Sequence, residues 1–198
     1  MGVISNGTTL LDGGSLDSGV ASGALVLIKT LTASNSGDLS FVNGSSNVVF
    51  DGTYKEYIFK FFDIHPSADN IDGLTFQGST DGGSSYNTTI TSTYFRATLD
   101  ESGSNGALAY QESQDQPQGT GYQNISQSIG TDNDQSGSGF LHVFDPASTT
   151  FVKHFMARSN NYHQSDKSRD VYTAGFFNTT SAINAIQFKT SSGNIDAG

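Results

Sequence analysis

The chain has 198 residues, a formal net charge of -10 and no cysteine. That length suits a single domain, and the acidic balance, with nine Lys and Arg residues, excludes nucleic acid as an expected partner because phosphate binding needs a basic face. The lack of cysteine excludes disulfides and thiolate metal sites, so stability has to come from the core, from assembly or from bound ions.

The first 23 residues are small and polar with short apolar islands, which predicts an arm that packs onto a partner. The start carries no basic residues and no long apolar stretch, so neither a signal peptide nor membrane insertion is expected. We therefore divide the chain into an N-terminal arm over residues 1–23 and a single domain over residues 24–198.

The first strands are expected directly after the arm. Ala24–Thr32 is apolar on both faces apart from one lysine, which predicts a central strand covered on two sides. Asp38–Val42 and Asn47–Phe50 predict a hairpin about Asn43–Gly44, a dipeptide that favours the positive φ of tight turns.

The clearest strand signal is the run Lys55–Asp63. Its aromatic residues Tyr57, Phe59 and Phe61 alternate with a second set of side chains, which is a strand period with almost no helical alternative. Runs of this kind recur along the chain between segments rich in Gly, Ser, Asn and Asp, which predicts one antiparallel, all-β unit.

The middle of the chain predicts one pair of strands and then an ambiguous stretch. Ile71–Gln77 and Thr88–Leu99 are expected to form a pair, joined by Ser79–Tyr86 with its Asp-Gly-Gly turn. Gly103–Tyr110 allows a short helical turn.

Gln111–Gly139 is the longest stretch without strand character, and loops of this length in compact domains are usually functional or mobile. We expect it to face outward as a contact surface. After it, Phe140–Phe144 and Thr149–Arg158 predict a hairpin around Asp145–Ser148, where proline follows aspartate as turn chemistry prefers.

Two more strands, Val171–Phe177 and Ile183–Thr190, are joined by Asn178–Ala182, and the last residues return to turn composition. The total of roughly eight to ten strands fits an antiparallel β-sandwich of the jelly-roll type. The chain has no convincing internal repeat, which disfavours propellers and β-helices.

One segment matches the opening of a calcium-binding loop. Asp132, Asp134, Ser136 and Gly137 place alternate oxygens before a glycine. A full loop of this type ends in glutamate at its twelfth position, where Val143 stands. A solvated acidic turn is therefore the favoured interpretation, with calcium in an irregular loop as the alternative.

Histidines offer a second metal hypothesis. His142 and His154 fall on the two arms of the predicted hairpin and could face each other, as a zinc pair would require. A third ligand is not evident, so packing is favoured. His65 and His163 are expected in loops without an assignable partner.

Two further kinds of site were weighed. A glycosidase needs two carboxylates across a cleft, for which the chain offers Asp100, Glu101, Glu112 and Asp115, but acidic residues on loops usually serve solvation. Exposed loop residues could bind sugars by stacking and hydrogen bonding, or could form ordinary surface and subunit contacts; these are Tyr122, Asn124 and Tyr162. We assign no catalytic, cofactor or metal residue.

Four stretches together resemble a group of structural virion proteins of marine tailed phages, including cyanophages. The stretches are Ser40–Pro66, Gln118–Asn124, Pro146–Arg158 and Ala174–Gly198, the last reading AGFFNTTSAINAIQFKTSSGNIDAG. The resemblance implies a capsid or tail location and no enzymatic role. Sequences of that group usually run past the last glycine into one more short strand, so an unaccounted edge strand is expected.

These observations predict a non-enzymatic virion protein that decorates the capsid or forms part of a fibre or knob. Its expected partners are other virion proteins and copies of itself, in a homo-oligomer for which a trimer is preferred. The arm and the sheet edges would make these contacts. A receptor-binding or glycan-binding module of a tail fibre is the first alternative, and a glycan hydrolase is the second.

Overall fold

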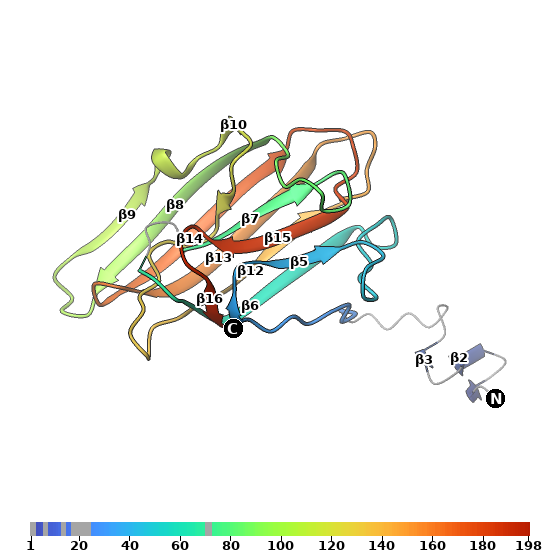
Figure 1. Ribbon diagram of the computed structural model, residues 1–198, viewed down its shortest axis with the longest axis horizontal. Helices are drawn as coiled ribbons and strands as arrows, with labels where there is room; N and C mark the ends of the chain where they lie inside the picture. The colour runs from blue at the N-terminus through green and yellow to red at the C-terminus, as the bar shows by residue number, and fades with distance from the viewer. Residues whose placement is uncertain (1–2, 6–7, 13–14, 17–24, 70–72) are drawn as a thin grey trace.

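The computed structural model describes residues 3–5, 8–12, 15–16, 25–69 and 73–198 of the chain. In this part, β-strands are the regular elements apart from one 3-10 turn, η1 (Glu112–Gln114). Two antiparallel sheets pack face to face (Figure 1), so the predicted all-β sandwich is confirmed. The described residues contain no helix that is long and apolar enough to cross a membrane.

Three short strands near the N-terminus pair antiparallel with one another: β1 (Val3–Ser5), β2 (Thr8–Asp12) and β3 (Ser15–Leu16). The expected arm over residues 1–23 therefore contains strands. Its other residues lie outside the described part of the chain.

The larger sheet of the sandwich has nine strands. Their order is β10 (Pro117–Gly119), β8 (Ile90–Asp100), β14 (Lys167–Phe177), β13 (Lys153–His163), β12 (Gly137–Phe144), β6 (Glu56–Pro66), β16 (Ile195–Ala197) and β4 (Ser34–Ser36), with β9 (Gly106–Tyr110) also paired to β8. The smaller sheet has the order β11 (Gln123–Asn124), β7 (Leu74–Ser79), β15 (Ala185–Thr190) and β5 (Leu39–Val42).

Eight of these strands follow the order of a jelly roll. The larger sheet contains β4-β16-β6-β12 and the smaller sheet contains β5-β15-β7-β11 as neighbours, so the chain passes repeatedly from one sheet to the other. The remaining strands, β8, β9, β10, β13 and β14, all extend the larger sheet beyond β12. The strand order of these eight strands is thus that of a jelly roll, and the larger sheet is extended on one side.

Aromatic side chains fill the space between the smaller sheet and the centre of the larger one. Phe76 on β7 is fully buried, and its ring lies 5.0 Å from that of Phe155 and 6.1 Å from that of Phe177, in edge-to-face geometry. Such pairs add to the stabilisation that burial alone provides. Every second residue of β13 is buried, so the inward-facing side chains of this strand contribute to the aromatic layer.

The extension of the larger sheet reaches past the smaller sheet, and a segment that begins with β11 and continues as irregular chain covers its inner face. We call residues 123–130 the strap; each of them is buried. Side chains of the sheet satisfy the backbone of the strap: Ser159 Oγ donates to the carbonyl of Ile125 at 2.6 Å, and Asn161 Nδ2 donates to that of Gln127 at 3.0 Å. Buried irregular backbone is stable only with such partners.

The strap corrects the expectation that Gln111–Gly139 faces outward. Ile125 and Ile129 within it are almost fully buried, and the same stretch contains η1, β10 and β11. Its polar composition suggested a surface loop, but that polarity matches the Ser, Asn and Arg side chains of the sheet beneath it.

Other expected elements also differ. Ala24–Thr32 forms no strand over its described residues, and Asn47–Phe50 forms no strand either, although Gly44 has the expected positive φ of 77°. Gly103–Tyr110 gives strand β9 rather than a helical turn, and the last residues give strand β16. β16 pairs with β4 and β6, which lie far away in sequence, whereas β9 forms a hairpin with β8 that the Gly- and Ser-rich composition did not reveal.

The expected pairing of Ile71–Gln77 with Thr88–Leu99 is wrong. Residues 70–72 lie outside the described part, and β7 belongs to the smaller sheet while β8 belongs to the larger one. The Asp81–Gly83 turn between them thus joins two sheets rather than two neighbouring strands. The predicted hairpin about Asp145–Ser148 is confirmed, since β12 pairs with β13.

Strand β6 carries a bulge near its end. Phe61 lies opposite Gly139 and Ile64 opposite Gly137, so two residues of β6 face one residue of β12. Asp63 within the bulge has a φ of 51°. The extra residue restores an inward direction to Ile64, which keeps both Phe61 and Ile64 in the core.

Candidate functional site

One side of the sandwich is open. Strand β6 is hydrogen-bonded to β12 along one edge, whereas its other edge pairs only at its end, where β16 meets His65 and Pro66. Strand β5 pairs with β15 and is the last strand of the smaller sheet. In the described residues, therefore, both sheets present an unpaired strand edge on the same side of the molecule.

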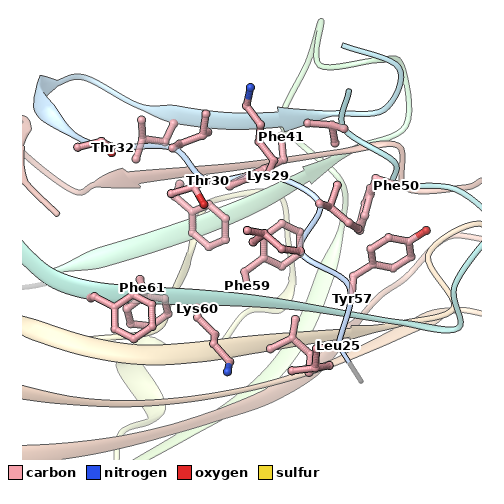
Figure 2. Close-up of a pocket in the computed structure, with 18 of the residues that line it drawn as sticks. Leu25, Lys29, Thr30, Thr32, Phe41, Phe50, Tyr57, Phe59, Lys60 and Phe61 are labelled. Atoms are coloured by element: carbon pink, nitrogen blue, oxygen red, sulfur yellow. The ribbon is translucent and has the colours of Figure 1, made fainter. Parts of the chain in front are cut away.

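An apolar cleft of about 590 Å³ lies between these edges. Residues 25–32 run along it, and β5 and β6 contribute the rings of Phe41, Tyr57, Phe59 and Phe61. Figure 2 shows these rings between the strands, while the ammonium groups of Lys29 and Lys60 point away from them. The cleft therefore exposes an edge of the core.

The aromatic rings of the cleft are ordered by contact with one another. The ring of Phe59 lies 5.3 Å from that of Phe41 and 5.4 Å from that of Phe188. Yet Phe41 and Phe59 are only half-buried, although both face the interior. The sandwich thus leaves part of its own aromatic layer uncovered on this side.

Residues 25–33 cross the mouth of the cleft instead of forming the expected central strand. Ile28 packs against the core, but Leu25, Val26 and Leu27 are 71%, 56% and 82% exposed. The apolar character of both faces was interpreted as burial between two layers within one chain. These three adjacent large apolar side chains instead form an exposed apolar patch beside the cleft.

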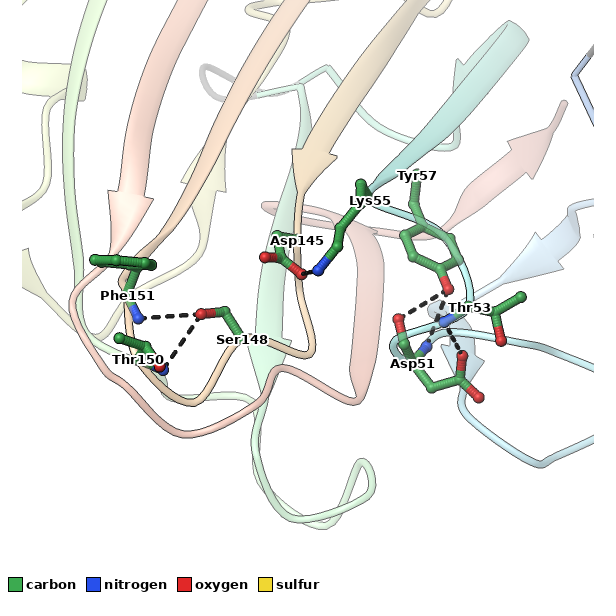
Figure 3. A network of polar contacts seen from close by, with 8 residues as sticks. All are labelled: Asp51, Thr53, Lys55, Tyr57, Asp145, Ser148, Thr150 and Phe151. Atoms are coloured by element: carbon green, nitrogen blue, oxygen red, sulfur yellow. Dashed lines mark hydrogen bonds and ion pairs between the residues drawn. The ribbon is translucent and has the colours of Figure 1, made fainter. Parts of the chain in front are cut away.

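A polar network fixes one end of the open side (Figure 3). The hydroxyl of Tyr57 donates to the carbonyl of Asp51 at 3.0 Å, and a carboxylate oxygen of Asp51 accepts from the backbone of Thr53 at 2.8 Å. The hydrogen bonds from Thr53 lower the pKa of Asp51. Nearby, Lys55 forms an exposed ion pair with Asp145 at 3.0 Å. These bonds hold the loop that leads into β6.

The outer face of the larger sheet carries a row of aromatic and charged side chains. The rings of Phe95 and Tyr172 stack in parallel at 4.8 Å, and the guanidinium of Arg158 lies 4.9 Å from the centre of the Tyr172 ring. Arg158 also donates two hydrogen bonds to Asp170. The stack covers one face of each ring.

The residues suggested for sugar binding do not form a common site. Asn124 lies buried in the strap, and its amide donates to Gln114. Tyr122 is half-buried with its hydroxyl bonded to Gln187, and burial raises its pKa to about 12. Tyr162 lies on strand β13 rather than in a loop, and a hydrogen bond to Glu101 raises its pKa to about 12.

The histidines are not arranged as expected. His142 lies opposite Met156, two pairs away from facing His154, and its ring nitrogen contacts Glu56 at 2.6 Å. His65 lies on β6 and His163 on β13, not in loops. In the described residues, no group of three or more His, Asp or Glu side chains gathers as a metal site would need.

The acidic candidates are distributed over separate turns. Asp132 and Asp134 lie in an exposed turn that Gln135 closes through a backbone bond to Asp132. Asp100 organises the β8–β9 turn, where the side chain of Asn105 holds its pKa at about 2. Asp115 accepts from the hydroxyl of Tyr110, Glu101 contacts Tyr162, and Glu112 begins η1. The calcium alternative stays a prediction.

Sequence reasoning missed the residues that make the open side distinctive, namely Leu25, Leu27, Phe41 and Phe59. The available signal was the run of apolar residues from 24 to 32, which was interpreted as internal. Comparison with family models, with curated proteins and with solved structures finds no match to the chain. The fold and this side of the sandwich are therefore the basis for inferring a function.

Proposed function

We propose that the chain is a non-enzymatic structural protein of a phage virion, either a capsid decoration or a component of a fibre or knob. The open side of the sandwich would bind neighbouring copies of the same chain, giving a homo-oligomer. Other virion proteins would then be contacted by the remaining surface.

The observation that carries the proposal is the coincidence of three features on one side. Two unpaired strand edges, on β5 and β6, flank an apolar cleft, and Leu25, Val26 and Leu27 are exposed beside it. An unpaired edge can accept a strand from another chain, and exposed apolar side chains gain free energy when a partner covers them. A second copy can provide both a strand edge for pairing and an apolar surface for burial, since it carries the same edges and the same apolar segment.

The jelly-roll order gives additional support by analogy, because viral capsid domains often have this fold. Lectin domains share it, so the fold alone does not choose between assembly and sugar binding. The sequence resemblance to virion proteins favours assembly.

The location is tested by a cryo-EM reconstruction of the virion in which this chain is traced. Density on the capsid lattice or along a fibre is the expected result. Density at the distal tip of a tail fibre would instead favour the receptor-binding alternative. Absence of the chain from purified virions by mass spectrometry would overturn the proposal.

The contact surface is tested separately in the purified protein by light scattering coupled to size exclusion. Leu27→Asp is expected to shift the oligomer to monomer, with a Kd raised at least tenfold. Leu108→Asp is the matched control, since Leu108 is 76% exposed but lies on β9, away from the cleft lining. If Leu108→Asp dissociates the oligomer and Leu27→Asp does not, the open side is not the interface.

A further inference from the structure

Two arginines lie together on the inner face of the extended sheet, beneath the strap. Arg96 comes from β8 and Arg169 from the neighbouring β14. Both guanidinium groups donate to the side-chain oxygen of Gln127, and Arg169 also donates to the carbonyl of Gln127 at 3.2 Å. The side-chain oxygen of Gln127 therefore accepts hydrogen bonds from two cationic groups.

Neither arginine forms an ion pair with a carboxylate in the described part of the chain. Arg169 is only 6% exposed, and its buried Nε has no hydrogen-bond partner. Arg158, by contrast, lies on the opposite face of the same sheet and is paired with Asp170 through two bonds. The Arg96–Arg169 pair thus lacks the anionic partner that Arg158 has. A buried cation without an anion costs free energy.

The surroundings add positive rather than negative character. Burial, followed by the nearby Arg96, lowers the pKa of Arg169 to about 10. Burial, followed by Arg169, Lys167 and Arg96, lowers the pKa of His163 to about 4, so this ring is neutral at pH 7. Among the described residues, Asp69 is the acidic group whose charge acts on His163, and its carboxylate already accepts from Thr131.

We propose that a small tetrahedral oxyanion, such as phosphate or sulfate, binds between Arg96 and Arg169 in place of the side-chain oxygen of Gln127. Its oxygens would accept from both guanidinium forks, which match tetrahedral oxyanions in geometry. The backbone carbonyl of Gln127 would keep its bonds from Arg169 and Asn161, so the strap need not move. Arg96 is half-buried and provides the way in.

The ligand is a free ion rather than a group on a polymer. Arg169 lies beneath the strap, where a charged polysaccharide chain could not reach it. The site is also independent of the open side, since its residues do not line the cleft. It would stabilise the fold by pairing the two buried cations with an anion, without taking part in assembly.

The test is thermal unfolding of the purified protein in chloride buffer and in the same buffer with sodium phosphate at constant ionic strength. Phosphate at ten times its Kd is expected to raise the Tm by about 3–5 °C. In Arg96→Gln this increase is expected to disappear, while Arg158→Gln should keep it. Both variants experience the same general salt effect, so the difference between their phosphate-induced Tm increases reports binding at this site.

A second result is expected without phosphate. Removing one of two like charges should leave Arg96→Gln at least as stable as the unchanged protein in chloride, and phosphate should reverse this order. Equal Tm increases in all three proteins, or none, would overturn the proposal. So would an increase caused by dextran sulfate but not by free sulfate, because that would indicate a surface polyanion site.

Discussion

The two parts of the interior are stabilised in different ways. Beneath the smaller sheet, Phe76, Phe155 and Phe177 fill space with interlocking rings. Beneath the strap, Ser159 and Asn161 form hydrogen bonds to irregular backbone. The aromatic part depends on volume and the strap part on paired donors and acceptors, so the two should respond to different substitutions.

The largest expected effect is in the aromatic part. Phe76→Ala should lower the free energy of unfolding by about 3–5 kcal/mol, because it removes a buried ring and leaves a cavity among three other rings. Urea denaturation followed by circular dichroism measures this. Phe62→Ala, at a ring that is 65% exposed, is the control and should cost less than about 0.5 kcal/mol. Similar losses in both would show that the rings do not form a packed layer.

Acid should weaken the strap part through His163. The backbone of Ser165 donates to its Nδ1 at 3.0 Å, and the pKa is lowered from 6.5 to about 4, so the folded protein keeps the ring neutral. The unfolded chain takes up a proton below about pH 6.5 and the folded chain does not until about pH 4. The contribution of His163 to the free energy of unfolding is therefore fully present above pH 6.5. The free energy of unfolding should fall by about 2–3 kcal/mol as the pH approaches 4.

His163→Asn tests this effect, because its side-chain oxygen can replace Nδ1 as acceptor without titrating in this range. Its free energy of unfolding should decline less than that of the unchanged protein between pH 7 and pH 4. Carboxylates with lowered pKa values, such as Asp51 and Asp100, act equally in both proteins. Identical pH profiles would mean that His163 is protonated freely in the folded state.

A single hydrogen bond to the strap gives the smallest effect. Ser159→Ala would leave the carbonyl of Ile125 without its buried donor, at an expected cost of about 1–3 kcal/mol in urea denaturation. Thr93→Ala, on the exposed face of β8, should cost no more than about 0.5 kcal/mol. A loss for Ser159→Ala no larger than that control would indicate that water satisfies the strap backbone.

The sequence predicted those parts of the fold whose partners lie close by. The alternation of Tyr57, Phe59 and Phe61 located β6, and the turn at Asp145 located the β12–β13 hairpin. The strap was not predictable in this way, because its burial depends on donors from β13 and β14 that composition does not connect with it. The open side was also missed, since an apolar run such as 24–32 looks the same whether its own chain or another molecule covers it.

The topology has a kinetic consequence. Ile90 on β8 pairs with Phe177 on β14, and Ser36 on β4 pairs with Ile195 on β16. The larger sheet therefore forms only when distant parts of the chain come together. Proteins dominated by such distant pairings fold slowly, because loop closure precedes the contacts that stabilise it. We therefore expect refolding to be slow for the size of this domain, with the edge of β5 that β15 covers and the end of β6 that β16 covers exposed to aggregation until those strands pair.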